Sequence, residues 1–417
     1  MNARANRLPL VDSLRAIAAL SVLLTHTAVA AGISGNPHSV LSPYAQRLDV
    51  GVAIFFLISG LLLYRPFVKA RLTGRRAPAT GPYAWRRCLR IVPAYWLALT
   101  ITVIWVGTSA YELGVFTPSG FPTYYLMLQT YRPSTLSGGL LQAWTLTIEV
   151  TFYAFLPVWA WLLRRLPARS RRDALRCELL SLLVLVVISE VWKGVVLAAQ
   201  NSPHQVVITP LLDALPAFLD QFALGMGLAV LSVWLELREG TPRWVARFDR
   251  APILSWVFAA AAFYVVSRRI GISVRFFAPM GVWQYLGRQW LYAAVALGLL
   301  LPAVIGDQTR GLPRRILSWR VLGWLGLVSY GIYLWQTPVL TQLQRWNFGA
   351  HSIVQPWLWW SAGALAMSAA IAAASYYLME RPLLSLKDRF GGPSSAPGEA
   401  LTESAPATPA RGPAVTP

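Results

Sequence analysis

The sequence predicts an all-α protein, a polytopic transmembrane helical bundle of about ten spans. Of its 417 residues, 56% are hydrophobic and only 13% are charged. Soluble domains carry about 25% charged residues, so this chain has too few to cover a soluble surface. Its apolar runs are long and continuous rather than ten-residue alternations, which favours helices over a β-barrel. Despite a net charge of +20, this composition excludes a disordered protein, a disulfide scaffold or a nucleic-acid module for the bulk of the chain.

Ten apolar runs approach the length that a spanning helix requires, about 20 residues. In chain order they lie near residues 10–31, 49–67, 90–107, 144–163, 177–199, 210–235, 252–268, 286–306, 321–343 and 356–380. The first run follows Arg4 and Arg7 and therefore resembles a cleavable signal peptide. Because it contains His26 and further runs follow it, we expect a retained helix. The stretch Tyr124–Gln129 is too short to span and is expected at the interface.

The distribution of Lys and Arg predicts the orientation of the bundle. On this map 29 of the 37 basic residues fall on one side, in the N-terminal segment, the loops after even-numbered spans and the tail. Seven fall on the other side, and Lys193 lies inside the fifth span. The positive-inside rule then places both the N- and the C-terminus in the cytoplasm.

The chain is expected to consist of one domain and a tail. Residues 1–385 contain all the spans, and residues 386–417 are rich in Pro, Ala, Ser, Thr and Gly, which predicts a disordered cytoplasmic tail. No appended soluble domain is expected. Cys88 and Cys177 both fall on the cytoplasmic side, where a structural disulfide is disfavoured, and neither has the spacing of a metal ligand.

Two ionisable side chains inside predicted spans are candidates for catalysis, because such groups are costly in a membrane. His26 and Glu149 each lie about five residues from the outer end of a span, roughly 8 Å below the boundary. If they face each other, the carboxylate would orient the imidazole for general-base or nucleophilic catalysis. The alternative is that His26 is an interhelical hydrogen-bonding group and Glu149 an interfacial residue.

Three arginines are candidates for binding an anionic ligand. Arg87 and Arg90 are three residues apart on one face at the start of the third span, which suits a phosphate-rich ligand. The alternative is anchoring to lipid headgroups. Arg15 lies eleven residues before His26, so about 16 Å along the same helix, and Asp12 is placed to pair with it.

Further polar groups have ordinary structural explanations. Glu190 and Lys193 are three residues apart and are expected to neutralise each other. Asp213 and Asp220 either line a wet cavity or lie near the outer end of the sixth span. The run from Ser329 to Pro338 contains tyrosines that also make common helix contacts, and its proline predicts a kink.

Taken in order, six motifs resemble the acyltransferase-3 family of integral membrane acyltransferases. They are Leu14-Arg15 with His26, Gly51 to Ser59-Gly60, Arg87-Cys-Leu-Arg90-Ile-Val-Pro93, Trp144-Thr-Leu-Thr-Ile-Glu149 with Phe152-Tyr153 and Pro157, Ser329-Tyr330-Gly-Ile-Tyr333-Leu, and Glu380-Arg-Pro382. Each motif alone has low specificity, but their order and their positions across residues 10–382 make the resemblance specific.

The resemblance implies a plasma-membrane O-acyltransferase. It would take acetyl or another short acyl group from cytoplasmic acyl-CoA, a co-substrate, with no bound cofactor and no metal. The acceptor would be a hydroxyl of a cell-envelope glycan, a glycolipid or a secondary metabolite. By the resemblance His26 is the catalytic histidine and Glu149 the second polar active-site residue, while Arg87 and Arg90 face the CoA phosphates.

The other motif residues receive less definite roles from the resemblance. Arg15 matches a family arginine and is grouped with the acyl-CoA site, and Ser59, Tyr330 and Tyr333 are candidate supporting residues. Gln336 departs from the family, which often has histidine at this position. Because glutamine cannot carry a proton at neutral pH, a proton relay at this position is not expected.

A membrane transporter or a lipid or glycan flippase is the main alternative function. Buried polar residues among about ten spans suit it equally well. Such folds often contain paired repeats with broken helices, and no paired halves are recognisable in this sequence. A non-catalytic sensor is a third possibility, supported only by the basic loops.

Overall fold

The computed structural model describes residues 8–106, 114–135, 138–200, 209–274, 279–348 and 356–388. Within these ranges the regular elements are helices and no strand occurs, which confirms the expected all-α class. Of the expected tail at 386–417, residues 389–417 lie outside the described residues.

Among the described residues, eight helical segments are long and apolar enough to cross a membrane. They are α1 (Val11–Ala30), α2 to α3 (Ser42–Ala45, Gly51–Leu72), α4 (Thr80–Val106), α6 (Trp144–Arg165), α7 (Arg171–Ala199), α8 (Leu219–Glu236), α11 (Val282–Val304) and α15 to α16 (Pro356–Ser375, Arg381–Leu384). A ninth is counted if α9 (Arg243–Arg250) and α10 (Ile253–Arg268), which meet at 72°, form one broken span. The expected number of ten is therefore corrected to eight or nine.

The expected span at 321–343 is interrupted in the structure. It forms α13 (Arg320–Leu327) and α14 (Ser329–Arg345), separated at Val328, and neither helix is long enough to cross alone. A Cβ atom on Gly326 would lie 1.9 Å from the Asp12 carbonyl oxygen, so the chain passes directly against α1 at this break. Every residue from Gly331 to Leu340 is buried, and α14 can therefore be polar because protein rather than lipid surrounds it.

Shorter elements complete the described chain. Helix α5 (Gly120–Tyr125) and a 3-10 turn at Gln129–Tyr131 occupy the segment that was expected to be too short to span. The remaining pieces are α12 (Leu312–Leu317), the π-helix η7 (Tyr376–Glu380), and the 3-10 helices η2 (Leu48–Val50), η5 (Leu141–Ala143), η6 (Leu215–Phe218) and η8 (Ser385–Asp388).

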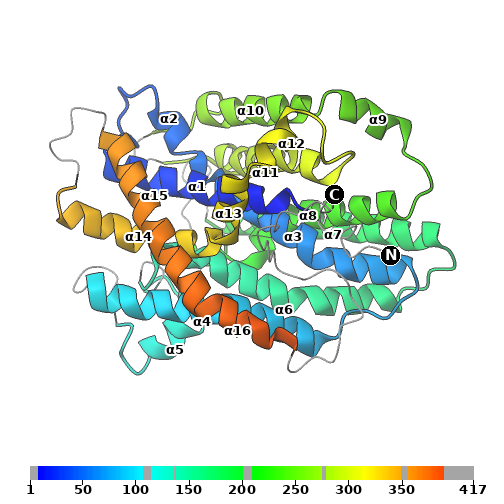
Figure 1. Cartoon of the computed structure of the whole chain (residues 1–417), viewed down its shortest axis with the longest axis horizontal. Coiled ribbons are helices and arrows are strands. Elements are labelled where there is room, and N and C mark those ends of the chain that lie inside the picture. Colours follow the sequence, from blue (N-terminus) through cyan, green and yellow to red (C-terminus); the bar gives the residue numbers. More distant parts are fainter. Residues whose placement is uncertain are drawn as a thin grey trace, which may run out of the picture.

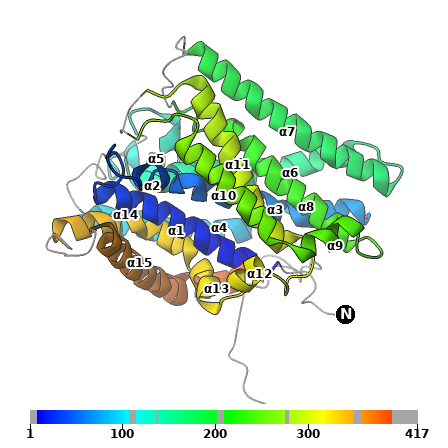
Figure 2. The same ribbon diagram turned by 90° about the horizontal axis from the view of Figure 1, so that it is seen from above.

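Helix α3 is the central helix of the bundle and packs against α1, α6, α7, α8 and α11. Helix α14 packs against α1, α4 and α15 on another side of α1 (Figures 1 and 2). Helix α7 lies along one edge of the molecule in Figure 2. Of the helices that carry the candidate site, α1 and α6 pack against α3, while α4 packs against α6 and α14.

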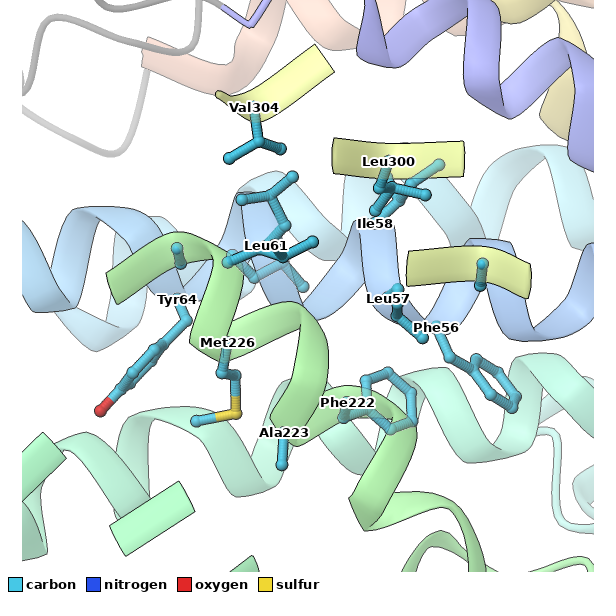
Figure 3. Packing of buried hydrophobic residues seen from close by; sticks show 14 of the residues in the cluster. Phe56, Leu57, Ile58, Leu61, Tyr64, Phe222, Ala223, Met226, Leu300 and Val304 are labelled. Carbon is cyan, nitrogen blue, oxygen red and sulfur yellow. The ribbon is translucent and has the colours of Figure 1, made fainter. Parts of the chain in front are cut away.

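The tightest packing joins α3 to α8. A Cβ atom on Gly60 would lie 2.4 Å from the Phe222 carbonyl oxygen, and one on Gly225 would lie 2.1 Å from that of Leu57. Small residues on both helices thus bring the two backbones into contact, as is common for membrane helices. Figure 3 shows the side chains of Phe56 and Phe222 facing each other, and their ring centroids are 4.8 Å apart.

Candidate active site

The Glu149 carboxylate is held inside the bundle by two hydroxyl groups. Ser59 of α3 donates a hydrogen bond of 2.8 Å to Glu149 Oε1, and Tyr153, one turn further along α6, donates one of 3.1 Å to Oε2. Arg15 of α1 and Arg90 of α4 also interact electrostatically with this carboxylate. The structure therefore places Ser59, a candidate supporting residue, directly on Glu149.

The arginines and Glu149 form one cluster of charged groups, which we call the arginine layer. Arg15 makes the expected ion pair with Asp12 at 3.4 Å and lies close enough to Arg90 for electrostatic interaction. Arg90 interacts in the same way with Glu380 of the sixth motif. The Arg87 guanidinium lies 6.0 Å from the centre of the Tyr83 ring.

Tyr330 joins this layer from α14. Its hydroxyl donates a hydrogen bond of 3.0 Å to the Ile91 carbonyl oxygen of α4, next to Arg90. It also interacts electrostatically with Glu149 and Glu380. Motif residues that are far apart in the sequence thus meet on the inner faces of α1, α3, α4, α6, α14 and the C-terminal end of the last span.

His26 lies further along α1, eleven residues and about 16 Å from Arg15. Gln336 and Asp49 are its polar neighbours, and Asp49 interacts with it electrostatically. The ring nitrogen Nδ1 is buried and has no hydrogen-bond partner among the described residues. His26 therefore has a different set of neighbours from the arginine layer.

The described contacts of His26 and Glu149 do not include each other. Helix α3 packs against both α1 and α6 and supplies the Ser59 hydroxyl to Glu149. The idea that Glu149 orients the imidazole thus has no contact to support it, while the catalytic roles of the two residues stay predictions. Asp49 and Gln336 are the polar groups that the structure places beside His26.

Gln142, which sequence reasoning missed, shapes α14 next to the candidate site. Pro338 cannot donate a backbone hydrogen bond to the Leu334 carbonyl oxygen, one turn earlier. The Gln142 amide supplies this donor at 2.6 Å and also donates to the Tyr333 carbonyl oxygen at 3.1 Å. Its own oxygen accepts from Thr337 at 2.5 Å. The proline in the motif was the available signal, because a broken helix needs a substitute donor.

Tyr333 is fixed in the same region of α14. Its hydroxyl lies 2.7 Å from Thr145 Oγ1, and its ring meets that of Phe55 edge to face at 5.7 Å between centroids. These contacts hold the turn that carries Gln336, so Tyr333 supports the site through packing.

A second polar group next to His26 was also missed. Asp49 in η2 accepts a hydrogen bond from the Tyr292 hydroxyl of α11, and the Arg288 guanidinium lies 5.9 Å from the centre of the Tyr292 ring. Arg288 falls within the expected span 286–306. This position was the available signal, since charge within a span marks a polar interior.

The remaining polar groups have structural roles. Lys193 pairs with Glu190 at 2.6 Å, as expected, and also with Asp220 at 3.0 Å. Asp213 lies in the segment before η6, where burial raises its pKa to about 6. Among the described residues, no three His, Cys, Asp or Glu side chains are grouped so as to hold a metal ion.

The fold and this site define a multi-pass membrane protein with an imidazole and an arginine layer in its interior. A family model described as an acyltransferase domain matches residues 9–377, nearly the whole described chain. The protein therefore belongs to the acyltransferase-3 family of integral membrane acyltransferases.

The curated proteins that match the chain include relatives named as acyltransferases. The peptidoglycan O-acetyltransferase OatA of Listeria monocytogenes is 24% identical over 388 residues, which cover 90% of this chain and 55% of OatA. The acyltransferase MdmB of Streptomyces mycarofaciens is 25% identical over 97% of this chain and 98% of its own length. Nodulation protein 10 of Rhizobium leguminosarum is 28% identical over 81% of this chain and 82% of its length. The chain spans about half the length of the peptidoglycan acetyltransferases that it matches. No solved structure matches it significantly.

Proposed function

We propose that the protein is a membrane-bound O-acyltransferase. It moves acetyl or another short acyl group from cytoplasmic acyl-CoA to a hydroxyl of a cell-envelope glycan, a glycolipid or a secondary metabolite. The observation that carries this proposal is the two-level arrangement along α1, with the arginine layer at one level and His26 about 16 Å further along the helix. Names of relatives such as OatA and MdmB agree with the transfer of acyl groups.

The arginine layer suits the phosphates of CoA. Guanidinium groups bind phosphate oxygens in a bidentate manner, and Arg15, Arg87 and Arg90 approach one site from two helices. Glu149 then acts on these arginines, because its described charged neighbours are Arg15 and Arg90. The thin pantetheine arm would extend from this layer towards His26 between the helices.

His26 suits the chemical step. Its unpartnered Nδ1 can take the proton of the acceptor hydroxyl while that oxygen attacks the thioester carbonyl carbon. The new C–O bond forms, the C–S bond breaks, and the proton leaves with the CoA thiolate as the free thiol. An acyl-imidazole intermediate is the other route by which the same residue could act. Gln336 would lie beside the ring as a polar neighbour without exchanging a proton.

The orientation belongs to the same proposal. Both termini and the arginine layer face the cytoplasm, where acyl-CoA is made, and the His26 end faces the outer side of the plasma membrane. A cysteine-accessibility test with a membrane-impermeant reagent on single cysteines at Ser39 and Ser318 separates this orientation from the reverse one. Only the first should react from outside.

Replacing His26 by Ala tests the proposed function. We expect the variant to insert and fold but to lose acylation by about 10²-fold or more, the scale of lost general-base catalysis. The measurement is transfer of radiolabelled acetyl from acetyl-CoA to envelope glycans and glycolipids in membranes that contain equal amounts of each protein. Wild-type transfer by this variant would refute the proposal. Export or uptake by wild type without an acylated product would favour a transporter.

A further inference from the structure

A hollow of about 360 Å³ lies where α3 and α6 end and α7 begins. These three helix ends meet at the right-hand end of the bundle in Figure 1. The residues that line it are Ala70, Arg71, Leu72, Gly74, Arg164, Leu166, Ala168, Arg169, Ser170, Arg171 and Ala174. None of them belongs to the candidate active site, and we call this hollow the arginine pocket.

Arg71 is the unusual residue of the pocket. Its side chain is only 8% exposed, and its one described ion pair joins Nε to Glu178 Oε1 at 3.5 Å. Its two terminal nitrogens, Nη1 and Nη2, are buried and have no hydrogen-bond partner among the described residues. Glu178 also accepts a hydrogen bond from the Tyr64 hydroxyl, so this carboxylate is shared. Burying a guanidinium with two unsatisfied nitrogens is costly, which indicates a partner other than the residues that the structure describes.

The surroundings of Arg71 favour an anion as that partner. Arg164, Arg169 and Arg171 also line the pocket, and the described lining contains no carboxylate. The pocket adjoins the N-terminus of the 29-residue helix α7, where the helix dipole adds positive potential. Ser170 caps this helix by accepting a hydrogen bond of 3.1 Å from the Asp173 backbone, so the first turn is well formed.

Positive-inside topology accounts for the number of arginines here but not for the burial of Arg71. An arginine that only anchors a helix end extends its guanidinium to water or headgroups. Arg71 instead keeps its terminal nitrogens buried, and it lines a hollow that Arg164, Arg169 and Arg171 also line. Planar guanidiniums in this arrangement match the oxygens of a phosphate group.

We propose that the arginine pocket binds a phosphate group at the end of the bundle, independently of the acyl transfer site. The phosphate belongs either to the headgroup of an anionic membrane lipid or to a soluble phosphate compound. The chemistry of recognition is the same for both, with Arg71 as the buried ligand and Arg164, Arg169 and Arg171 around it.

The test uses the full-length protein and two probes. In one arm, native mass spectrometry compares binding of phosphatidylglycerol and phosphatidylcholine to the detergent-purified protein. In the other arm, isothermal titration with inorganic phosphate measures binding of the free anion. Preference for phosphatidylglycerol alone identifies a lipid headgroup, and binding of inorganic phosphate identifies a soluble ligand. Binding of neither probe would overturn the proposal and leave these arginines as topology signals only.

Two variants and a matched control assign the binding to the pocket. Arg71→Gln should weaken it about tenfold or more, because it removes a buried charged partner. The double variant Arg169→Gln/Arg171→Gln changes only exposed residues and keeps the test valid if Arg71→Gln does not fold; it should weaken binding at least threefold. Arg172→Gln/Arg176→Gln removes the same amount of charge from the first turns of α7, outside the pocket, and should change binding by less than twofold. Equal losses in both double variants would refute a specific site.

Discussion

Replacing Glu149 by Gln distinguishes two roles for this carboxylate. It either interacts with Arg15 and Arg90 of the arginine layer or orients the His26 imidazole. Gln keeps the size of the side chain and one acceptor oxygen, but it removes the negative charge between Arg15 and Arg90. Removing one partner from a buried charge cluster costs about 3–5 kcal/mol. Arg15 retains Asp12, and Arg90 retains its interaction with Glu380, so we expect a smaller loss of about 1–3 kcal/mol in the free energy of unfolding.

The same substitution should strengthen the binding of CoA. A unit charge about 8 Å from a phosphate contributes about 2 kcal/mol at an effective dielectric constant of about 20. Removing the Glu149 charge therefore should tighten CoA binding about thirtyfold, and CoA should stabilise the variant more than the wild type. Thermal unfolding of the purified protein over a range of CoA concentrations measures both effects.

Ser59→Ala is the matched control for this experiment. It removes one hydrogen bond to Glu149 and no charge, so it should cost about 1 kcal/mol of stability and leave CoA affinity within about twofold. If Glu149 instead orients His26, Glu149→Gln should lower kcat by two orders of magnitude or more and leave CoA affinity unchanged. That result would refute our reasoning about the arginine layer.

The remaining predictions concern α14, the α3–α8 contact and a titration outside the spans. Gln142→Leu leaves the Leu334 carbonyl oxygen without its side-chain donor, while the Tyr333 carbonyl oxygen keeps the Gln336 amide at 3.3 Å, so it should cost about 1–3 kcal/mol in thermal unfolding; no measurable loss would contradict the role we give to Gln142. Gly225→Ala should destabilise the protein by about 3 kcal/mol or more, since its Cβ would lie 2.1 Å from a carbonyl oxygen, whereas Gly227→Ala on the same helix should be tolerated. The raised pKa of Asp213, about 6, means that the folded state binds a proton more tightly than the unfolded state, so stability should fall by at most about 3 kcal/mol as pH rises from about 4 to 6. Asp213→Asn should abolish this slope, and an unchanged slope would show that another group titrates.

The fold class was predictable from the sequence. Low charge and continuous apolar runs indicate spanning helices whatever their order, because lipid satisfies no backbone polar group. The sequence placed Glu149 with His26 near the outer side and Arg90 at the acyl-CoA site on the cytoplasmic side, whereas in the structure Glu149 accepts a hydrogen bond from Ser59 and interacts with Arg15 and Arg90. The roles of these residues stay predictions.

The neighbours of His26 were not predictable in the same way. Counting residues from the outer ends of two spans placed His26 and Glu149 at the same depth, whereas Glu149 interacts with Arg15, which lies about 16 Å along α1 from His26. Helix α3 packs against both α1 and α6, and the residues beside His26 come from η2 and α14 instead. Asp49 lies directly before α3, and Gln336 stands where the family often has histidine. The sequence therefore did not indicate that either residue lies beside His26.

The count of Lys and Arg that predicts the membrane topology does not distinguish buried arginines from exposed ones. Arg71, Arg288 and Arg314 were all loop or helix-end charges in the sequence, yet the Arg314 side chain is fully buried and pairs with Asp249 at 2.8 Å. Arg288 lies against Tyr292 within α11, and Arg71 keeps its terminal nitrogens buried and lines a hollow. A count of charges along the chain does not record such burial. The distribution of charge therefore predicts the orientation of the bundle in the membrane. Burial of the side chain distinguishes candidate ligand-binding arginines from arginines that anchor a helix end at the membrane surface. The Arg71→Gln variant and its control on α7 therefore test a general criterion as well as this pocket. The criterion is that a buried guanidinium with unsatisfied nitrogens identifies a ligand site, even where most basic residues are explained by the positive-inside rule.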